Sequence, residues 1–314
     1  MKDEDQGRPD GLGRRGLLKC MAWGGTGLVW SVGGGLPRAL GLEQAMAATP
    51  SQAFSFLQVS DSHIGFTKPA NPDARITYRE AVAKIAAMPQ KPDFIIHTGD
   101  ISQLSRPGEF DDADQIIGEA GVPVFHVPGE HDMLDDGAGK AYLDRYGKGA
   151  LGAGWFSFDH RGVHFVGLVN VANLKAGGMG DLGPEQLAWL KQDLASRTSS
   201  TPIVVFAHIP LWTIYPDWGW GTDDASEALG YLARFGSVTV LNGHIHQVMQ
   251  KVEGRVAFHT ARSTAFLQPA PGAAPGPGPV KVADDRLRSV LGIRRVEVVR
   301  GDGPLAVIDT PLSA

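Results

Sequence analysis

Short apolar runs alternate with longer amphipathic or polar segments along the chain from Phe54 onward. Six of these runs are four to seven residues long and rich in β-branched and aromatic side chains, which is typical of buried strands. The predicted strands are Phe54–Val59, Phe94–His97, Val122–Val127, Val163–Val169, Ile203–Ala207 and Val238–Leu241. Two hairpins are also predicted, Trp155–Asp159 with Gly162–Leu168 and Arg294–Val299 with Leu305–Asp309.

Helical patterns lie between the predicted strands. The clearest are Arg75–Met88, which ends before a proline, and Gly183–Leu194, where a proline sits in the first turn and leucines recur on one face. Weaker patterns cover Glu109–Gly118, Gly139–Tyr146 and Asp224–Phe235. The alternation of strands and helices predicts a single α/β domain.

Composition and charge narrow the class of protein. The chain has 314 residues, of which 43% are hydrophobic and 20% charged, and this balance excludes a disordered chain, a collagen and a membrane channel. The formal net charge of −5 offers no basic surface to bulk nucleic acid. The single cysteine excludes an intramolecular disulfide.

Residues 1–47 do not follow the pattern of the domain. Arg14 and Arg15 are followed by x-Leu-Leu-Lys, then by the glycine-rich apolar stretch Met21–Leu36 and by the Ala-x-Ala sequence at Ala45–Ala47. This order resembles a twin-arginine (Tat) export signal. It predicts cleavage after Ala47, a mature chain of residues 48–314 without a transmembrane span, and delivery by the Tat machinery to the periplasm or the cell exterior. A retained N-terminal anchor is the alternative.

Metal-ligating side chains follow five of the predicted strands. Ligands bind at the carboxyl ends of strands in an open α/β sheet, so these side chains are expected to converge on one crevice. Carboxylates and imidazoles are ligands for divalent and trivalent metals. The candidates are Asp61, His63, Asp100, Glu130, His131, Asp132, His208, His244 and His246.

The spacing of these residues adds a geometric expectation. Asp61 and His63 are two residues apart, so an extended backbone would point both side chains at one ion, and the same holds for His244 and His246. Asp100 is the candidate carboxylate to bridge two ions about 3.5–4 Å apart. The glycines that precede several of these residues leave room where a side chain would crowd an ion. Each motif is weak alone, and the ordered set carries the prediction.

The ordered set Asp61-x-His63, Gly99-Asp100, Gly129-x-His131-Asp132, His208 and Gly243-His244-x-His246 resembles the calcineurin-like metallophosphoesterase superfamily. The resemblance implies an α/β/β/α sandwich of four layers, built on two mixed sheets, with two transition-metal ions (iron, manganese or zinc) at the strand ends. It implies that Asp61, His63, Asp100 and His246 hold the first metal, and that Asp100, Glu130, His208 and His244 hold the second. His131 would protonate or stabilise the leaving oxygen, and Asp132 would orient His131.

One position departs from the family pattern, and a second lacks a ligand that one branch of the family has. Glu130 stands where the family usually has asparagine, which adds a negative charge that either ligates the second metal or turns away from it. Gln103 stands where purple acid phosphatases have a tyrosine ligand, so their colour is not expected.

Several other segments keep two interpretations. His97 and His126 are predicted to be packed or supporting groups, and His259 could line the cleft. The aromatic loop Leu211–Trp220 either stacks on a nucleobase or aryl group or covers the sheet edge. The Pro/Gly-rich segment 269–279 is predicted to be an extended loop, either at the mouth of the site or without a role in it.

The sequence therefore predicts an exported phosphoesterase that hydrolyses a small phosphodiester or phosphomonoester with a hydroxide bridging two metals. A nucleotide-like substrate is one alternative. The charge of Glu130 favours the diester, because a monoester dianion is repelled more strongly. The rival interpretations are a metal-binding or partner-binding protein without hydrolase activity, and redox chemistry at an iron site.

Overall fold

The computed structural model describes residues 28–33, 36–41, 53–298 and 305–313. The chain divides into two units, Met1–Ser51 and Gln52–Ala314. In the first unit, β1 (Leu28–Gly33) and β2 (Leu36–Gly41) form a two-stranded antiparallel sheet that the sequence did not predict. The twin arginines and the predicted cleavage site lie outside the described residues.

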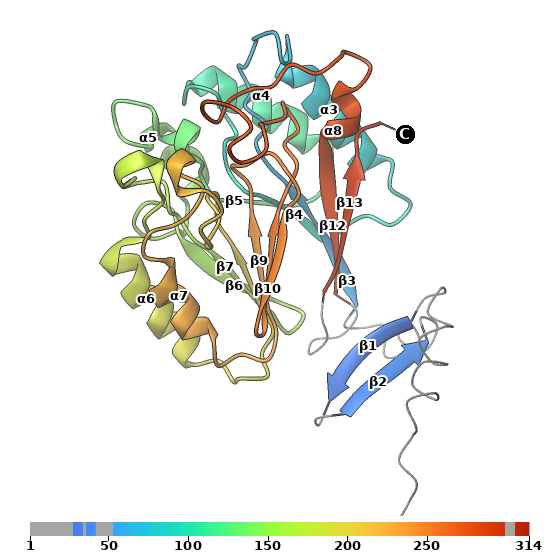
Figure 1. The fold of residues 1–314 in the computed structure, drawn as a ribbon, viewed down its shortest axis with the longest axis vertical. Helices are drawn as coiled ribbons and strands as arrows, with labels where there is room; N and C mark the ends of the chain where they lie inside the picture. Colours follow the sequence, from blue (N-terminus) through green and yellow to red (C-terminus); the bar gives the residue numbers. More distant parts are fainter. Residues whose placement is uncertain (1–27, 34–35, 42–52, 299–304, 314) are drawn as a thin grey trace, which may run out of the picture. The chain divides into compact units, whose positions relative to one another are not determined.

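Two mixed sheets form the second unit (Figure 1). The five-stranded sheet has the order β13-β12-β3-β4-β5, and β3, β4 and β5 run parallel. Its strands are β3 (Phe54–Val59), β4 (Phe94–His97), β5 (Val124–His126), β12 (Gly292–Val298) and β13 (Ala306–Pro311). The six-stranded sheet has the order β10-β11-β9-β8-β7-β6. Its strands are β6 (Phe156–His160), β7 (Val163–Gly167), β8 (Ile203–Phe206), β9 (Val238–Asn242), β10 (Gln250–Glu253) and β11 (Val256–Thr260).

Helices cover the outer face of each sheet. Buried side chains of α3 (Ala74–Ala86) and α4 (Pro107–Gly118) pack against β3 and β4. Those of α6 (Gly183–Ala195) and α7 (Ala225–Leu232) pack against β7, β8 and β9, and Figure 1 shows this pair beside β6 and β7. The remaining short elements are α5 (Lys140–Tyr146), α8 (Leu287–Val290) and the 3-10 helices η1 (Glu130–Met133), η2 (Ala176–Gly178) and η3 (Pro216–Trp218).

A largely aromatic core joins the two sheets. Phe56 and Phe94 from one sheet meet Phe165 and Phe206 from the other, all buried. The Phe56 and Phe165 rings stand edge to face with their centroids 5.3 Å apart. Aromatic side chains of this size supply much of the apolar area that stabilises a core. The predicted α/β/β/α sandwich is confirmed.

Most predicted elements form, with small changes at their ends. The six predicted strands and both hairpin pairings are present, although Val122–Val127 shortens to β5. The helix predicted from Arg75 begins one residue earlier, because the Asp73 side chain accepts a hydrogen bond from the Arg75 amide and caps the helix. The β10–β11 hairpin and α8 were not predicted. Within the described residues, the helices are too short or too polar to cross a membrane.

Candidate metal centre

The candidate ligands meet at the carboxyl ends of strands from both sheets. They form a first ligand group of Asp61, His63 and His246, and a second ligand group of Glu130, His208 and His244. Each residue offers one ligating atom, and within a group these atoms all lie within 4.8 Å of one another.

Asp100 lies between the two groups and is shared by them. Its Oδ2 atom is 3.4 Å from His63 Nε2 in the first group and 3.4 Å from His208 Nε2 in the second. In the first group His246 Nε2 is 3.4 Å from Asp61 Oδ1 and 3.2 Å from His63 Nε2. The position of Asp100 is the one expected of a bridging carboxylate.

Glu130 points into the second group rather than away from it. Its Oε2 atom lies 2.9 Å from His208 Nε2, and its Oε1 atom lies 2.9 Å from His244 Nδ1. The Glu130 side chain is 26% exposed. Glu130 is the first residue of η1, which follows β5. Both oxygens of the unusual carboxylate are therefore available to a cation in this group.

The backbone at these residues is not extended, so the geometric reason given for the paired motifs is wrong. Five candidate ligands have left-handed φ values: Asp61 52°, His63 44°, Asp100 51°, His244 69° and His246 54°. This conformation costs about 1–2 kcal/mol per non-glycine residue. As a result, His244 and His246 enter different groups instead of gripping one ion.

Hydrogen bonds between distant segments hold this strained backbone. The Asp61 amide donates to the Gly99 carbonyl at 3.0 Å, and the His63 amide donates to the Asp100 carbonyl at 2.9 Å. The His244 amide donates to Asp61 Oδ1 at 3.0 Å, which joins the two sheets through a candidate ligand. Strain that is maintained in this way is typical of a functional site.

Glycines are required where the backbone passes the ligands. A Cβ atom on Gly129 would lie 2.1 Å from Asp100 Oδ1, and one on Gly243 would lie 2.1 Å from Ser60 Oγ and 2.7 Å from Asp61 Oδ2. The expectation that a side chain here would crowd an ion stays a prediction, and the crowding that the structure shows falls on Asp100, Ser60 and Asp61.

The unused ring nitrogens of three histidines have acceptors outside the groups. His208 Nδ1 lies 2.7 Å from the Thr98 carbonyl, His246 Nδ1 lies 2.7 Å from the Phe266 carbonyl, and His63 Nδ1 lies 3.1 Å from Gln103 Oε1. Such partners fix the tautomer that leaves Nε2 free for a metal.

Buried atoms without partners also indicate cation sites. Asp61 Oδ2 and His244 Nε2 are buried and make no hydrogen bond. An unpaired carboxylate oxygen in this position is costly unless a cation accompanies it. The donor set of carboxylate oxygens and imidazole nitrogens fits iron, manganese or zinc.

The charges of the site depend on one another. Burial lowers the pKa of His63 to about 3 although Asp100 opposes this, so the ring is neutral, as a ligand must be. Burial also favours the neutral forms of His208 and Glu130. Neighbouring groups of opposite charge outweigh this effect of burial. Asp100 and Glu130 raise the pKa of His208, and His244 and His208 lower the pKa of Glu130. Cations would replace the protons that now balance these carboxylates.

Among the described residues, the Asp132 carboxylate makes no hydrogen bond to the His131 ring. Its carboxylate accepts hydrogen bonds from the Ile101 and Gly129 amides, each at 3.0 Å, and from the Ser102 amide and hydroxyl, each at 2.8 Å. His131 Nδ1 instead lies 2.7 Å from the Gln103 carbonyl. That Asp132 orients His131 stays a prediction, and the fully buried carboxylate holds the backbone around Asp100 and Gly129.

The residues that complete the centre were mostly missed from the sequence. The Phe266 ring lies 4.7 Å from that of His63 and 4.5 Å from that of His246. Gln103 contacts both His63 and His131. Gln103 comes three residues after Asp100, which is a weak signal, and Phe266 has no local signal because it reaches the site from a separate segment.

The remaining histidines have packed or paired roles. His97 Nε2 lies 2.7 Å from Ser62 Oγ beside the first group, as predicted for a supporting residue. His126 stacks on Tyr146 with ring centroids 4.1 Å apart. His259 is half-buried on β11 and not in either ligand group.

The aromatic loop supports the site rather than presenting a flat surface to a substrate. Trp220 is fully buried and Trp218 is 9% exposed, and both pack on Ile245, which lies between His244 and His246. Ala274 of the Pro/Gly-rich loop joins the same cluster. These two tryptophans are packed, but against the loop that carries His244 and His246 and not against the sheet edge that the sequence analysis proposed.

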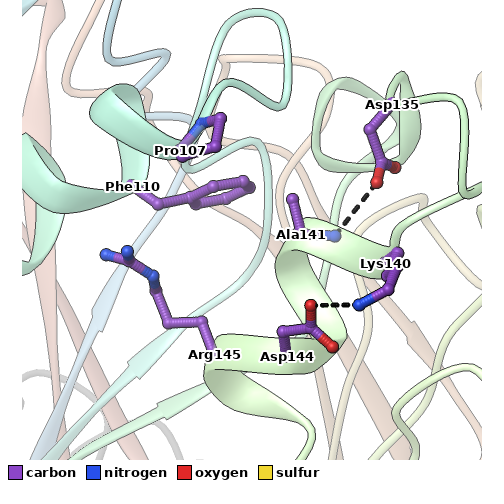
Figure 2. Close-up of a pocket in the computed structure, with 7 residues that line it drawn as sticks. All are labelled: Pro107, Phe110, Asp135, Lys140, Ala141, Asp144 and Arg145. Carbon is purple, nitrogen blue, oxygen red and sulfur yellow. Dashed lines mark hydrogen bonds and ion pairs between the residues drawn. The ribbon is translucent and has the colours of Figure 1, made fainter.

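A separate groove of about 400 Å³ lies between α4 and α5 (Figure 2). Its charged side chains already have partners: Lys140 pairs with Asp144, and Arg145 pairs with Asp114 at 2.8 Å. It shares no residue with the two ligand groups. The candidate metal centre is therefore the one formed by the two ligand groups at the strand ends.

The fold and the two candidate ligand groups are those of a metal-dependent hydrolase of phosphoric esters, and the family match agrees. The family model of calcineurin-like phosphoesterases matches residues 54–248, and the chain belongs to this family.

Curated relatives with related sequences are named as phosphodiesterases. The chain is 23% identical to a probable cyclic nucleotide phosphodiesterase of Psychrobacter arcticus, over 69% of this chain and 82% of the relative. It is 24% identical to a probable glycerophosphodiester phosphodiesterase of Arcobacter nitrofigilis, over 66% and 77%. These names favour hydrolysis over the non-catalytic and redox interpretations.

A solved structure shows the same fold. A dimetal phosphatase from Danio rerio superposes with a TM-score of 0.58 at 15% identity, covering 82% of this chain and 98% of that one.

Proposed function

We propose that this protein is an exported phosphodiesterase for small phosphodiester monoanions. The observation that carries the proposal is the Glu130 carboxylate, which faces His208 and His244 at 2.9 Å and adds a negative charge to the second ligand group. Within the described part of the chain, the ion pairs of Asp61, Asp100 and Glu130 are all with histidines. A site without a lysine or arginine partner is poorly matched to a phosphomonoester dianion.

The two ligand groups would each hold one metal ion. Asp61, His63 and His246 would bind the first ion, Glu130, His208 and His244 the second, and Asp100 both. Two bound ions supply charge neutralisation of phosphoryl oxygens and activation of water. The additional carboxylate oxygen favours a hard ion such as manganese or ferric iron in the second group.

His131 is placed to serve the leaving group. Its amide donates to Asp100 Oδ1 at 3.0 Å, and its Nδ1 donates to the Gln103 carbonyl at 2.7 Å. These two bonds fix the residue beside the shared carboxylate and leave Nε2 as the atom that would donate to the departing alkoxide.

The names of the relatives support a diester substrate. Cyclic nucleotides and glycerophosphodiesters both carry one negative charge on the scissile phosphodiester group. The proposal takes from them the class of small phosphodiester and no particular compound.

The direct test compares an aryl phosphodiester with the corresponding aryl phosphomonoester on mature protein loaded with manganese. The expected result is a higher kcat/KM for the diester. A protein that prefers the monoester would contradict the proposal, and one that hydrolyses neither would contradict the assignment of activity to this site.

Export rests on the sequence Arg14-Arg15-x-Leu-Leu-Lys and on the Ala-x-Ala sequence ending at Ala47. Replacing both arginines by lysine should retain the precursor in the cytoplasm, whereas the matched variant Arg8→Lys should be exported as the parent is. Fractionation of cells followed by immunoblotting measures both. Normal export of the double lysine variant would rule out the Tat route.

A further inference from the structure

Gln103 contacts two histidines of the site through different atoms. Its side-chain Oε1 lies 3.1 Å from His63 Nδ1 in the first ligand group. Its backbone carbonyl oxygen lies 2.7 Å from Nδ1 of His131, and its side-chain Nε2 lies 3.2 Å from the same atom. The rings of these two histidines stand edge to face with centroids 4.8 Å apart, so Gln103 lies where a metal ligand meets the leaving-group residue.

The donors and acceptors at Gln103 specify the tautomers of both rings. A carbonyl oxygen only accepts, so His131 Nδ1 must carry a hydrogen at this distance. Gln103 Oε1 is likewise an acceptor, so this orientation of the amide makes His63 Nδ1 the donor. His63 Nε2 is left without a proton, 3.4 Å from Asp100 Oδ2, as a metal ligand requires.

We propose that Gln103 is a positioning residue that sets the first metal site with its side chain and the leaving-group histidine with its backbone. This inference rests on the proposed function. The Gln103 side chain makes Nε2 of His63 the ligating atom, while the carbonyl aims Nε2 of His131 away from the backbone. One residue thereby fixes the relative placement of a metal ligand and a proton donor.

The backbone at Gln103 is held independently of its side chain. The Gln103 amide donates to the Ile64 carbonyl at 2.9 Å. The preceding Ser102 is bound by Asp132 through its amide and its hydroxyl, each at 2.8 Å. Asp132 therefore acts on His131 through this turn, and a side-chain substitution at position 103 leaves the carbonyl in place.

The carbonyl makes the shorter contact with His131 Nδ1, so substitutions of the side chain test mainly its role at His63. Gln103→Met keeps the length of the side chain and removes the acceptor, so His63 loses its partner. Gln103→Glu keeps acceptor oxygens only, which suits a donor at His63 Nδ1. If the Gln103 amide were turned so that its nitrogen faced His63, Gln103→Glu would instead lose manganese affinity. Gln115→Met, at an exposed position of α4, is the matched control.

The experiment measures the dissociation constant for manganese by competition with a chelator, alongside thermal unfolding and hydrolysis of aryl diesters with leaving groups of different acidity. Gln103→Met should weaken one of the two manganese sites by about 10- to 100-fold and leave the other near its parent affinity. Gln103→Glu should restore affinity to within a few fold of the parent. The dependence of rate on leaving-group acidity should stay unchanged in both, because the carbonyl keeps the shorter of the two contacts that Gln103 makes with His131 Nδ1.

Parent-like manganese affinity in folded Gln103→Met would overturn this inference alone. Equal loss in Gln103→Met and Gln103→Glu would also overturn it, because the acceptor would then not be the feature that matters. A parent protein that binds two manganese ions but hydrolyses no diester would refute the proposed function and leave the role of Gln103 in metal binding intact.

Discussion

Replacing Glu130 by glutamine removes one negative charge from the second ligand group and keeps the size of the side chain. Glu130 Oε2 and Asp100 Oδ2 lie 2.9 Å and 3.4 Å from the same atom, His208 Nε2. The two carboxylates are therefore within about 6 Å of each other, and a phosphoryl group bound between the ligand groups would lie at a similar distance from Glu130.

The size of the effect follows from this distance. A phosphomonoester dianion carries one more negative charge than a diester monoanion. Two unit charges about 6 Å apart interact by about 0.7 kcal/mol at the dielectric constant of water and by about 3 kcal/mol at an effective value of 20. Glu130→Gln should therefore raise kcat/KM for the monoester relative to the diester by about 3- to 100-fold.

The assay compares kcat/KM for an aryl monoester and an aryl diester in the parent and in Glu130→Gln, with metal content measured on the same samples. Glu185→Gln, at an exposed position of α6, is the control for loss of a carboxylate and should leave the ratio unchanged. A Glu130→Gln variant with two metals and an unchanged or lower ratio would refute the electrostatic argument and remove the reason for preferring diesters.

Three further predictions concern metal and stability. His246→Ala should weaken one metal site and His208→Ala the other, which elemental analysis at limiting metal would detect as one ion per chain instead of two. Gly129→Ala places a Cβ atom 2.1 Å from an oxygen of the shared carboxylate and should cost about 1–3 kcal/mol in denaturant unfolding. Gly118→Ala, which meets nothing within 4 Å, should cost less. Burial, with nearby Arg294, lowers the pKa of His259 to about 4, so the folded state binds fewer protons than the unfolded state between about pH 6.5 and 4. Stability should fall as the pH drops through this window, and His259→Gln should flatten the fall in melting temperature. Parallel curves would contradict that assignment.

The sequence alone was sufficient for most elements of the domain and for the residue types at the strand ends. The apolar runs from Phe54–Val59 to Val238–Leu241 are strands because their composition and length suit a buried sheet, and this information is local. Ligand-type residues follow these runs, and the rule that ligands gather at strand ends placed Asp100 between the two groups. Steric crowding at Gly129 was also predictable, because glycine is the residue that permits close approach.

The family resemblance implied how the ligands divide between the groups, and only the tertiary structure shows the backbone that produces this division. His244 and His246 have positive φ values, which local preference disfavours for histidine, so the sequence indicated an extended pair aimed at one ion. Bonds that join remote segments, such as the His244 amide with Asp61 Oδ1, maintain this backbone. The same holds for Asp132, whose partners Ile101 and Ser102 lie some thirty positions earlier in the chain. Contacts of this kind are set by the packing of two sheets, and no local pattern in the sequence encodes them.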